Sequence, residues 1–150
     1  MARVHAEASA TIDASPEAIY KIISDYKEGH PRILPEKNFS DLRVEEGGVG
    51  AGTVISFTTK AGGTEMKYRM KVEEPEPGRV LVERDLVGDV VTTFTITPAE
   101  GGRSLVKIET DYTASGGLKG FVERLASPGV LRKIYEAELK KLEAVVTQTG

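Results

Sequence analysis

The feature that limits the fold of this chain most is a series of alternating segments between residues 39 and 114. The clearest has Met66, Tyr68 and Met70 alternating with Lys67 and Arg69. A period of two puts successive side chains on opposite faces of a strand, one covered and one wet. Six such segments are expected, at residues 39–46, 52–60, 64–74, 79–87, 90–98 and 103–114. Glycine and proline turns separate them, which predicts an antiparallel meander.

The flanking regions add one strand and a helical cover. Residues 3–12 alternate small apolar and polar side chains and predict a first strand. A helix should begin at Ser15-Pro16-Glu17, because serine caps free amides and proline fits the first helical position. Apolar residues at three-and-four spacing then fill residues 118–146, with Ser127-Pro128 predicting a kink or a break between two helices. The sequence therefore predicts an α+β domain in which a long C-terminal helix lies across seven strands.

Composition narrows the possible classes of protein. With 150 residues and 39% hydrophobic content, the chain is expected to form one domain over residues 1–150. A net charge of −3 with interspersed signs argues against a nucleic-acid partner. The absence of cysteine rules out thiol chemistry and fits the cytoplasm, and no stretch is long and apolar enough for a signal peptide or membrane insertion. No cofactor is expected, and the sequence identifies no protein partner.

Two motifs carry a resemblance to a known superfamily. Residues 10–20, ATIDASPEAIY, are similar to its first strand and helix, and residues 49–54, VGAGTV, are similar to its turn into the third strand. The chain resembles, over essentially its whole length, the SRPBCC superfamily of START domains, birch-pollen-allergen-like proteins, polyketide cyclases and lipid-transfer proteins. One departure is the lack of tryptophan, which the family often has where Tyr20 stands. The resemblance implies a helix-grip fold, a curved seven-stranded antiparallel sheet wrapped around the C-terminal helix, with short helices after the first strand.

The resemblance also implies a cavity between sheet and helix that holds a small hydrophobic molecule. Strand parity and helix spacing give the candidate ligand-binding residues Phe57, Met66, Tyr68, Met70, Val82, Arg84, Thr92, Phe94, Thr110, Tyr112, Phe121, Leu125 and Tyr135. Methionines would supply an adaptable apolar wall, and tyrosine hydroxyls would orient a ligand. Ordinary core packing would produce the same alternation, so the cavity follows from the resemblance and not from the pattern.

Arg84 is the candidate with the most specific chemistry. Its parity with Val80, Val82 and Leu86 predicts a permanent charge under the helix, where it needs an anion. A bound carboxylate or enolate would serve. The alternatives are an internal pair with Glu123 or Asp111, or a bulge that turns Arg84 outward.

Other polar motifs give weaker indications. His5 has the parity of the wet face, and His30 precedes Pro31 in a segment where a solvated loop histidine is expected over a gating or acid–base role. Neither a metal site nor a catalytic triad is expected from two distant histidines. The glycines at 47–52 lack the lysine of a phosphate-binding loop and predict a turn.

The leading functional hypothesis is binding or transport of a small hydrophobic ligand, such as a lipid or polyketide. The first alternative is a polyketide cyclase or aromatase in which Arg84 or Tyr68 stabilises an enolate, although no catalytic constellation is visible. The second is a protein-interaction domain of the same fold, which a filled core and an exposed apolar patch would indicate.

Overall fold

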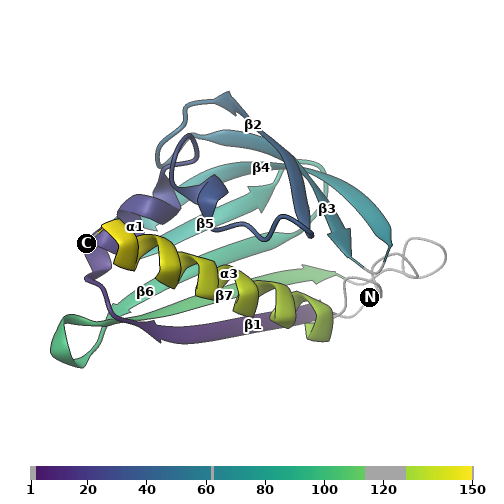
Figure 1. The fold of residues 1–150 in the computed structure, drawn as a ribbon. Coiled ribbons are helices and arrows are strands. Elements are labelled where there is room, and N and C mark those ends of the chain that lie inside the picture. The colour runs from purple at the N-terminus through teal and green to yellow at the C-terminus, as the bar shows by residue number, and fades with distance from the viewer. Residues whose placement is uncertain (1–2, 62, 114–127, 150) are drawn as a thin grey trace.

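A computed structural model describes residues 3–61, 63–113 and 128–149 of the chain (Figure 1). Its strands are β1 (Arg3–Ile12), β2 (Phe39–Glu46), β3 (Val54–Ala61), β4 (Thr64–Glu76), β5 (Val80–Asp85), β6 (Val91–Pro98) and β7 (Ser104–Thr113). The helices are α1 (Pro16–Ser24), the short η1 (His30–Arg32) and η2 (Glu100–Gly102), and α3 (Pro128–Thr149). The helical prediction for residues 118–125 lies outside the described residues.

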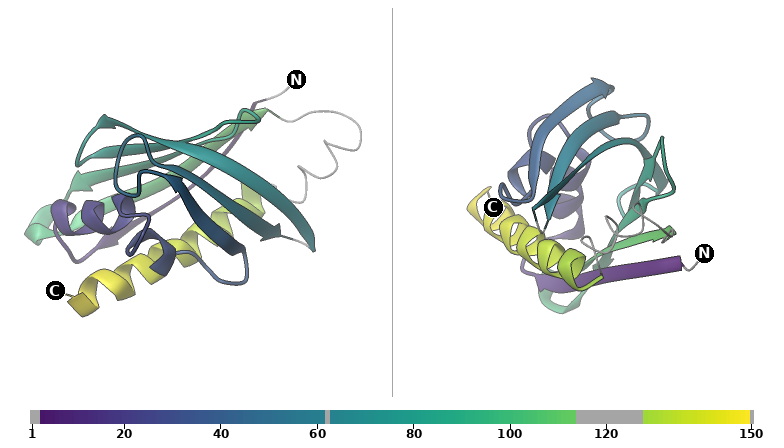
Figure 2. Two further views of the ribbon diagram at one scale, coloured as in Figure 1. Left: turned by 90° about the horizontal axis from the view of Figure 1, so that it is seen from above. Right: turned by 90° about the vertical axis from the view of Figure 1, so that its right-hand side faces the viewer.

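All seven strands form one antiparallel sheet in the order β1-β7-β6-β5-β4-β3-β2. Every neighbouring pair except β1 and β7 is consecutive in the chain, which confirms the predicted meander closed by the N-terminal strand. Register shifts interrupt the pairing of β2 with β3 and of β4 with β5. Such irregularities bend a sheet, and Figure 2 shows this sheet curling over α3. The α+β helix-grip fold expected from the sequence is confirmed.

The start of α1 follows its sequence signals. The side chain of Ser15 accepts a 3.2 Å hydrogen bond from the amide of Ala18, and Pro16 occupies the first turn. The helix ends at Ser24, because Asp25 adopts an extended backbone and forms a β-bridge with Val49. Tyr26 therefore lies just beyond α1, where its position is set by the loop and not by the helix.

The two halves of helix α3 pack differently against the sheet. Its second half buries Leu142, Val145 and Val146 in the hydrophobic core, beside α1 (Figure 1). Ile19 and Ile23 of α1 are fully buried in the same cluster. The first half of α3 instead lines a cavity, so the helix packs tightly on one end of the sheet and stands off the other.

Candidate functional site

A cavity of about 280 Å³ lies between the inner face of the sheet and the first half of α3. Its wall is mostly apolar and aromatic. Nine residues predicted from strand parity and helix spacing line it: Phe57, Met66, Tyr68, Met70, Thr92, Phe94, Thr110, Tyr112 and Tyr135. Their role in binding stays a prediction. Phe121 and Leu125 lie outside the described residues.

Val82 and Arg84 are corrections, because neither lines the cavity. In the observed register Glu83 pairs with Val72 and Thr92, whose side chains face inward, so the residues on either side of Glu83 face outward. The side chain of Arg84 is 53% exposed and its Nη2 lies 3.1 Å from Oε1 of Glu73. Arg84 therefore faces outward, as one alternative allowed, but no bulge occurs at Arg84 itself: residues 82–84 pair regularly with both neighbouring strands, and the partner of Arg84 is Glu73.

Glu83 occupies the inward position that had been expected for Arg84. It is buried, and its Oε2 accepts a 2.5 Å hydrogen bond from the hydroxyl of Tyr26. Burial and the charge of Glu83 hold the pKa of Tyr26 well above its ordinary value, so the phenol keeps its proton and remains a donor. The sequence predicted the positive charge of Arg84 inside the cavity, whereas the structure places the acidic side chain of Glu83 there.

His30 is also a correction, since it is only 2% exposed and is not a solvated loop residue. Its ring stacks on Tyr26 with centroids 4.4 Å apart, and the edge of Phe94 contacts it. Nδ1 lies 2.8 Å from the carbonyl oxygen of Ile23, which can only accept, so Nδ1 carries a proton. Nε2 then faces Oε2 of Glu83 at 3.6 Å. Burial of His30 depends on how residues 25–33 fold back on β6, and no local pattern indicates it.

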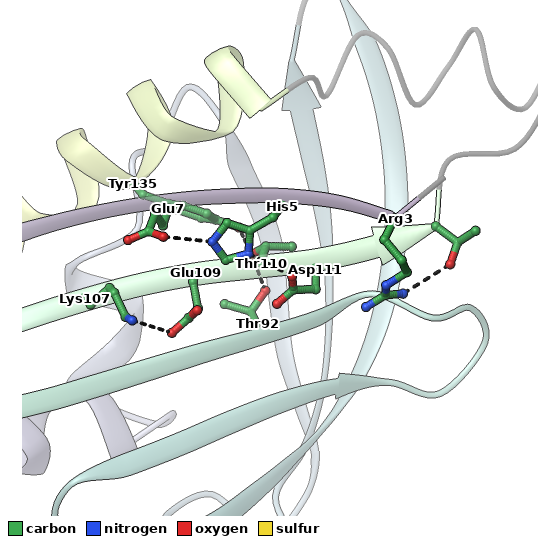
Figure 3. A network of polar contacts seen from close by, with 10 residues as sticks. Arg3, His5, Glu7, Thr92, Lys107, Glu109, Thr110, Asp111 and Tyr135 are labelled. Carbon is green, nitrogen blue, oxygen red and sulfur yellow. Dashed lines mark hydrogen bonds and ion pairs between the residues drawn. The ribbon is translucent and has the colours of Figure 1, made fainter. Parts of the chain in front are cut away.

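A chain of hydroxyls runs along the cavity wall (Figure 3). Oγ1 of Thr92 lies 2.7 Å from Oγ1 of Thr110, and Thr110 in turn forms a hydrogen bond with the hydroxyl of Tyr135. Burial raises the pKa of Tyr135, so this phenol also stays protonated. These residues come from β6, β7 and α3 and give the apolar wall one polar stripe.

Glu138 was missed by the sequence analysis. It lies one helical turn after Tyr135 on the buried face of α3, lines the cavity and is 2% exposed. Within the described residues its Oε1 has no hydrogen-bond partner. Burial, and then the charge of Glu83, raise the pKa of Glu138 well above its usual range. The signal was available, because Glu138 interrupts the three-and-four spacing that runs from Ile134 to Leu142.

A second polar cluster covers the outer face of β1 and β7 (Figure 3). Ligand atoms of His5, Glu109 and Asp111 lie within 4.8 Å of one another, close enough to consider a metal. However, Nδ1 of His5 is 2.8 Å from Asp111, its Nε2 is 2.9 Å from Glu7, and Lys107 pairs with Glu109 at 3.1 Å. The geometry therefore describes a surface ion-pair network in which His5, Glu109 and Asp111 already have side-chain partners.

The glycines at 47–52 form a turn, as the sequence predicts. The amides of Gly48, Gly50 and Gly52 donate hydrogen bonds to Thr53, Ser24 and Val72, so they are not open to a phosphate. None of the helices in the described part of the chain has the length and apolar character needed to cross a lipid bilayer.

Comparison with known proteins agrees with this geometry. Residues 3–147 match the model of a family described as polyketide cyclase / dehydrase and lipid transport. The chain belongs to this family. Among curated proteins no sequence matches it.

Several solved structures are similar to this family member. The solution structure of the KanY protein (ms6282) has a TM-score of 0.84 and 33% identity, covering 98% of this chain and 99% of that one. Zhui aromatase/cyclase from Streptomyces sp. R1128 has a TM-score of 0.79 at 16% identity, covering 98% and 95%. A START superfamily protein from Mycobacterium smegmatis has a TM-score of 0.71 at 19% identity, covering 97% and 99%. The last two similarities concern the fold alone.

Proposed function

We propose that this protein binds a small, largely apolar molecule in the cavity between the sheet and α3. The observation that carries the proposal is the wall itself, which combines aromatic and aliphatic side chains with a few convergent polar groups. The chain also belongs to a family described as polyketide cyclase / dehydrase and lipid transport, and this membership supports the same function. The protein would act as a cytoplasmic carrier or receptor for such a molecule.

The test uses displacement of an uncharged fluorophore, N-phenylnaphthylamine, by panels of lipids, sterols, polyketides and quinones. Native mass spectrometry of the purified protein would detect a retained ligand. Leu131→Trp should fill part of the cavity and weaken fluorophore binding, because Leu131 lines it from α3. Leu105→Trp is the matched control, since Leu105 is exposed on β7 and away from the cavity. Equal binding by both variants, or no binding by the unmodified protein, would overturn the proposal.

Catalysis of a cyclase type is the second candidate, favoured by the polar groups inside the cavity. Tyr26, His30 and Glu83 form one contacting set, and Tyr68 is a separate part of the cavity wall. A phenol hydroxyl can stabilise a developing enolate, and a histidine with a carboxylate can move protons. Turnover of a poly-β-ketone that falls in Tyr68→Phe and His30→Gln would support this role, and unchanged turnover in both would exclude it.

The cavity argues against the third hypothesis, a protein-interaction domain with a filled core. Among the described residues, the exposed large apolar side chains are the adjacent pair Leu86 and Val87 and the single residues Val49 and Leu105. Single exposed apolar residues and a pair of this size are common on protein surfaces and do not indicate a docking patch.

A further inference from the structure

We propose that the molecule held in this cavity is an apolar amine and that its ammonium group is bound by Glu138. This inference rests on the proposed function, because it names the head group of the ligand. It starts from a buried polar atom that the protein itself leaves unpartnered.

The carboxyl group of Glu138 is built into the wall of the cavity. Its side chain projects from the first half of α3, between Tyr135 and Leu142 on the buried face. In the part of the chain that the structure describes, Oε1 is buried and accepts no hydrogen bond. A buried polar group without a partner destabilises the protein, so a ligand that donates to it gains more than the same contact would give in water.

The basic side chains near Glu138 already have other partners. Lys141, in the next turn of α3, donates to the carbonyl of Leu34. His30 directs Nδ1 to the carbonyl of Ile23 and Nε2 to Glu83. Within residues 3–61, 63–113 and 128–149, Glu138 takes part in no ion pair, so a charged partner for it would have to be a bound molecule.

The charges around the cavity favour a cation over an anion. Glu83 on β5 faces the interior together with Glu138, and Asp85 and Asp89 lie at the rim. The exposed Lys67 opposes them, while no arginine among the described residues lines the cavity. Arg3 offsets Asp89 at 3.3 Å but does not reach inside. An enolate or carboxylate ligand would meet like charge here, whereas an ammonium group would meet opposite charge.

Two tyrosines, Tyr26 and Tyr135, lie close enough to Glu138 to interact with it electrostatically. Tyr26 donates to Glu83, and Tyr135 and Thr110 share a hydrogen bond. Burial, and then the charge of Glu83, raise the pKa of Glu138 and so favour the protonated carboxyl while the cavity is empty. An ammonium ion that pairs with it displaces the proton, so one proton leaves to solvent and one ion pair forms. An uncharged ligand releases none.

Four probes with one naphthyl group test the head group directly: naphthylmethylamine, naphthalenemethanol, naphthaldehyde and naphthoate. We expect the amine to bind at least about tenfold more tightly than the alcohol, as for a buried charge-assisted hydrogen bond. Calorimetry at neutral pH in buffers of different ionisation enthalpy should detect release of about one proton for the amine and none for the alcohol. Glu138→Gln should bring the amine-to-alcohol ratio close to one and keep alcohol binding. Glu136→Gln, an exposed position on the same helix, should change neither.

Each outcome decides the inference. Alcohol or aldehyde binding that equals amine binding, or an amine preference that survives Glu138→Gln, would overturn the amine assignment and leave the binding function standing. Absence of binding by all four probes and by the ligand panels would overturn both. The proton count uses the unmodified protein, so the test does not depend on how the variant folds.

Discussion

The hydroxyl of Tyr26 donates a 2.5 Å hydrogen bond to Oε2 of Glu83, joining the segment after α1 to β5 at the floor of the cavity. Both residues are buried, and His30 stacks on the phenol while its Nε2 faces the same carboxyl group. A buried carboxylate is tolerated only when donors surround it. Tyr26 and His30 therefore hold the side chain of Glu83 in place at the boundary between the packed core and the cavity.

Removal of the Tyr26 hydroxyl tests this arrangement. Tyr26→Phe leaves Glu83 buried without its shortest donor, so we expect the free energy of unfolding to fall by about 1–3 kcal/mol in urea denaturation. Tyr20→Phe is the control on α1. The hydroxyl of Tyr20 donates to Glu74 at 2.7 Å, but Glu74 also accepts from the amide of Ala51 in an exposed position, so the loss should be smaller. Equal losses would contradict a special role for the buried pair.

Arg84→Ala tests the corrected direction of β5. Because Arg84 forms an exposed ion pair with Glu73, its loss should cost no more than about 1 kcal/mol of stability. Fluorophore affinity should stay the same. Met70→Ala, at a buried position that lines the cavity, should cost about 2–5 kcal/mol and change that affinity. A large loss of affinity in Arg84→Ala would show that the guanidinium reaches the ligand after all.

The ion pairs of His5 on the outer face of the sheet should make the stability of the protein depend on pH. Hydrogen bonds to Asp111, and then to Glu7, raise the pKa of His5 above its ordinary value of 6.5. A raised pKa in the folded state means that the stabilisation is complete below 6.5 and is lost as pH rises through the folded value.

His5→Asn should therefore lower stability at about pH 5 but not at about pH 9. Because the side chain is 42% exposed, the effect should stay below about 1 kcal/mol and shrink in high salt. Urea denaturation of both proteins at the two pH values measures it. A difference that is larger at high pH would reverse the sign and reject the imidazolium pairs.

The correct predictions from the sequence came mostly from patterns among residues that are neighbours in the chain. The cap at Ser15 and the alternation of Met66, Tyr68 and Met70 depend on neighbouring residues only, and they gave the correct helix start and the correct inner face of β4. Parity is reliable where one face is apolar and the other charged. It also predicted the inward Thr92 and Thr110, although threonine alone does not indicate a core position.

Strand β5 shows where such reasoning fails. Val80, Leu81 and Val82 are three apolar residues in succession, and Leu81 and Val82 are both buried although they point to opposite faces. Alternation cannot orient a strand of this kind, so pairing with β4, after a register shift at Glu73, decides which side is inner. Glu83 was overlooked for that reason. Glu138 was overlooked although its helical spacing was visible, because a charged residue is expected to be exposed.

The last prediction concerns the glycine turn that holds Glu74. Gly50 and Gly52 both have positive φ, 70° and 90°, which favours glycine. A Cβ on Gly50 would lie 2.4 Å from Oε1 of Glu74, whereas a Cβ on Gly52 would meet nothing within 4 Å. Gly52→Ala should therefore cost only the backbone strain, about 1–2 kcal/mol, and Gly50→Ala should cost more because it also displaces Glu74 from Ala51 and Tyr20. In a Glu74→Ala background the two glycine substitutions should become equal in urea denaturation. If Gly50→Ala still costs more stability than Gly52→Ala in the Glu74→Ala background, contacts other than Glu74 require glycine at position 50.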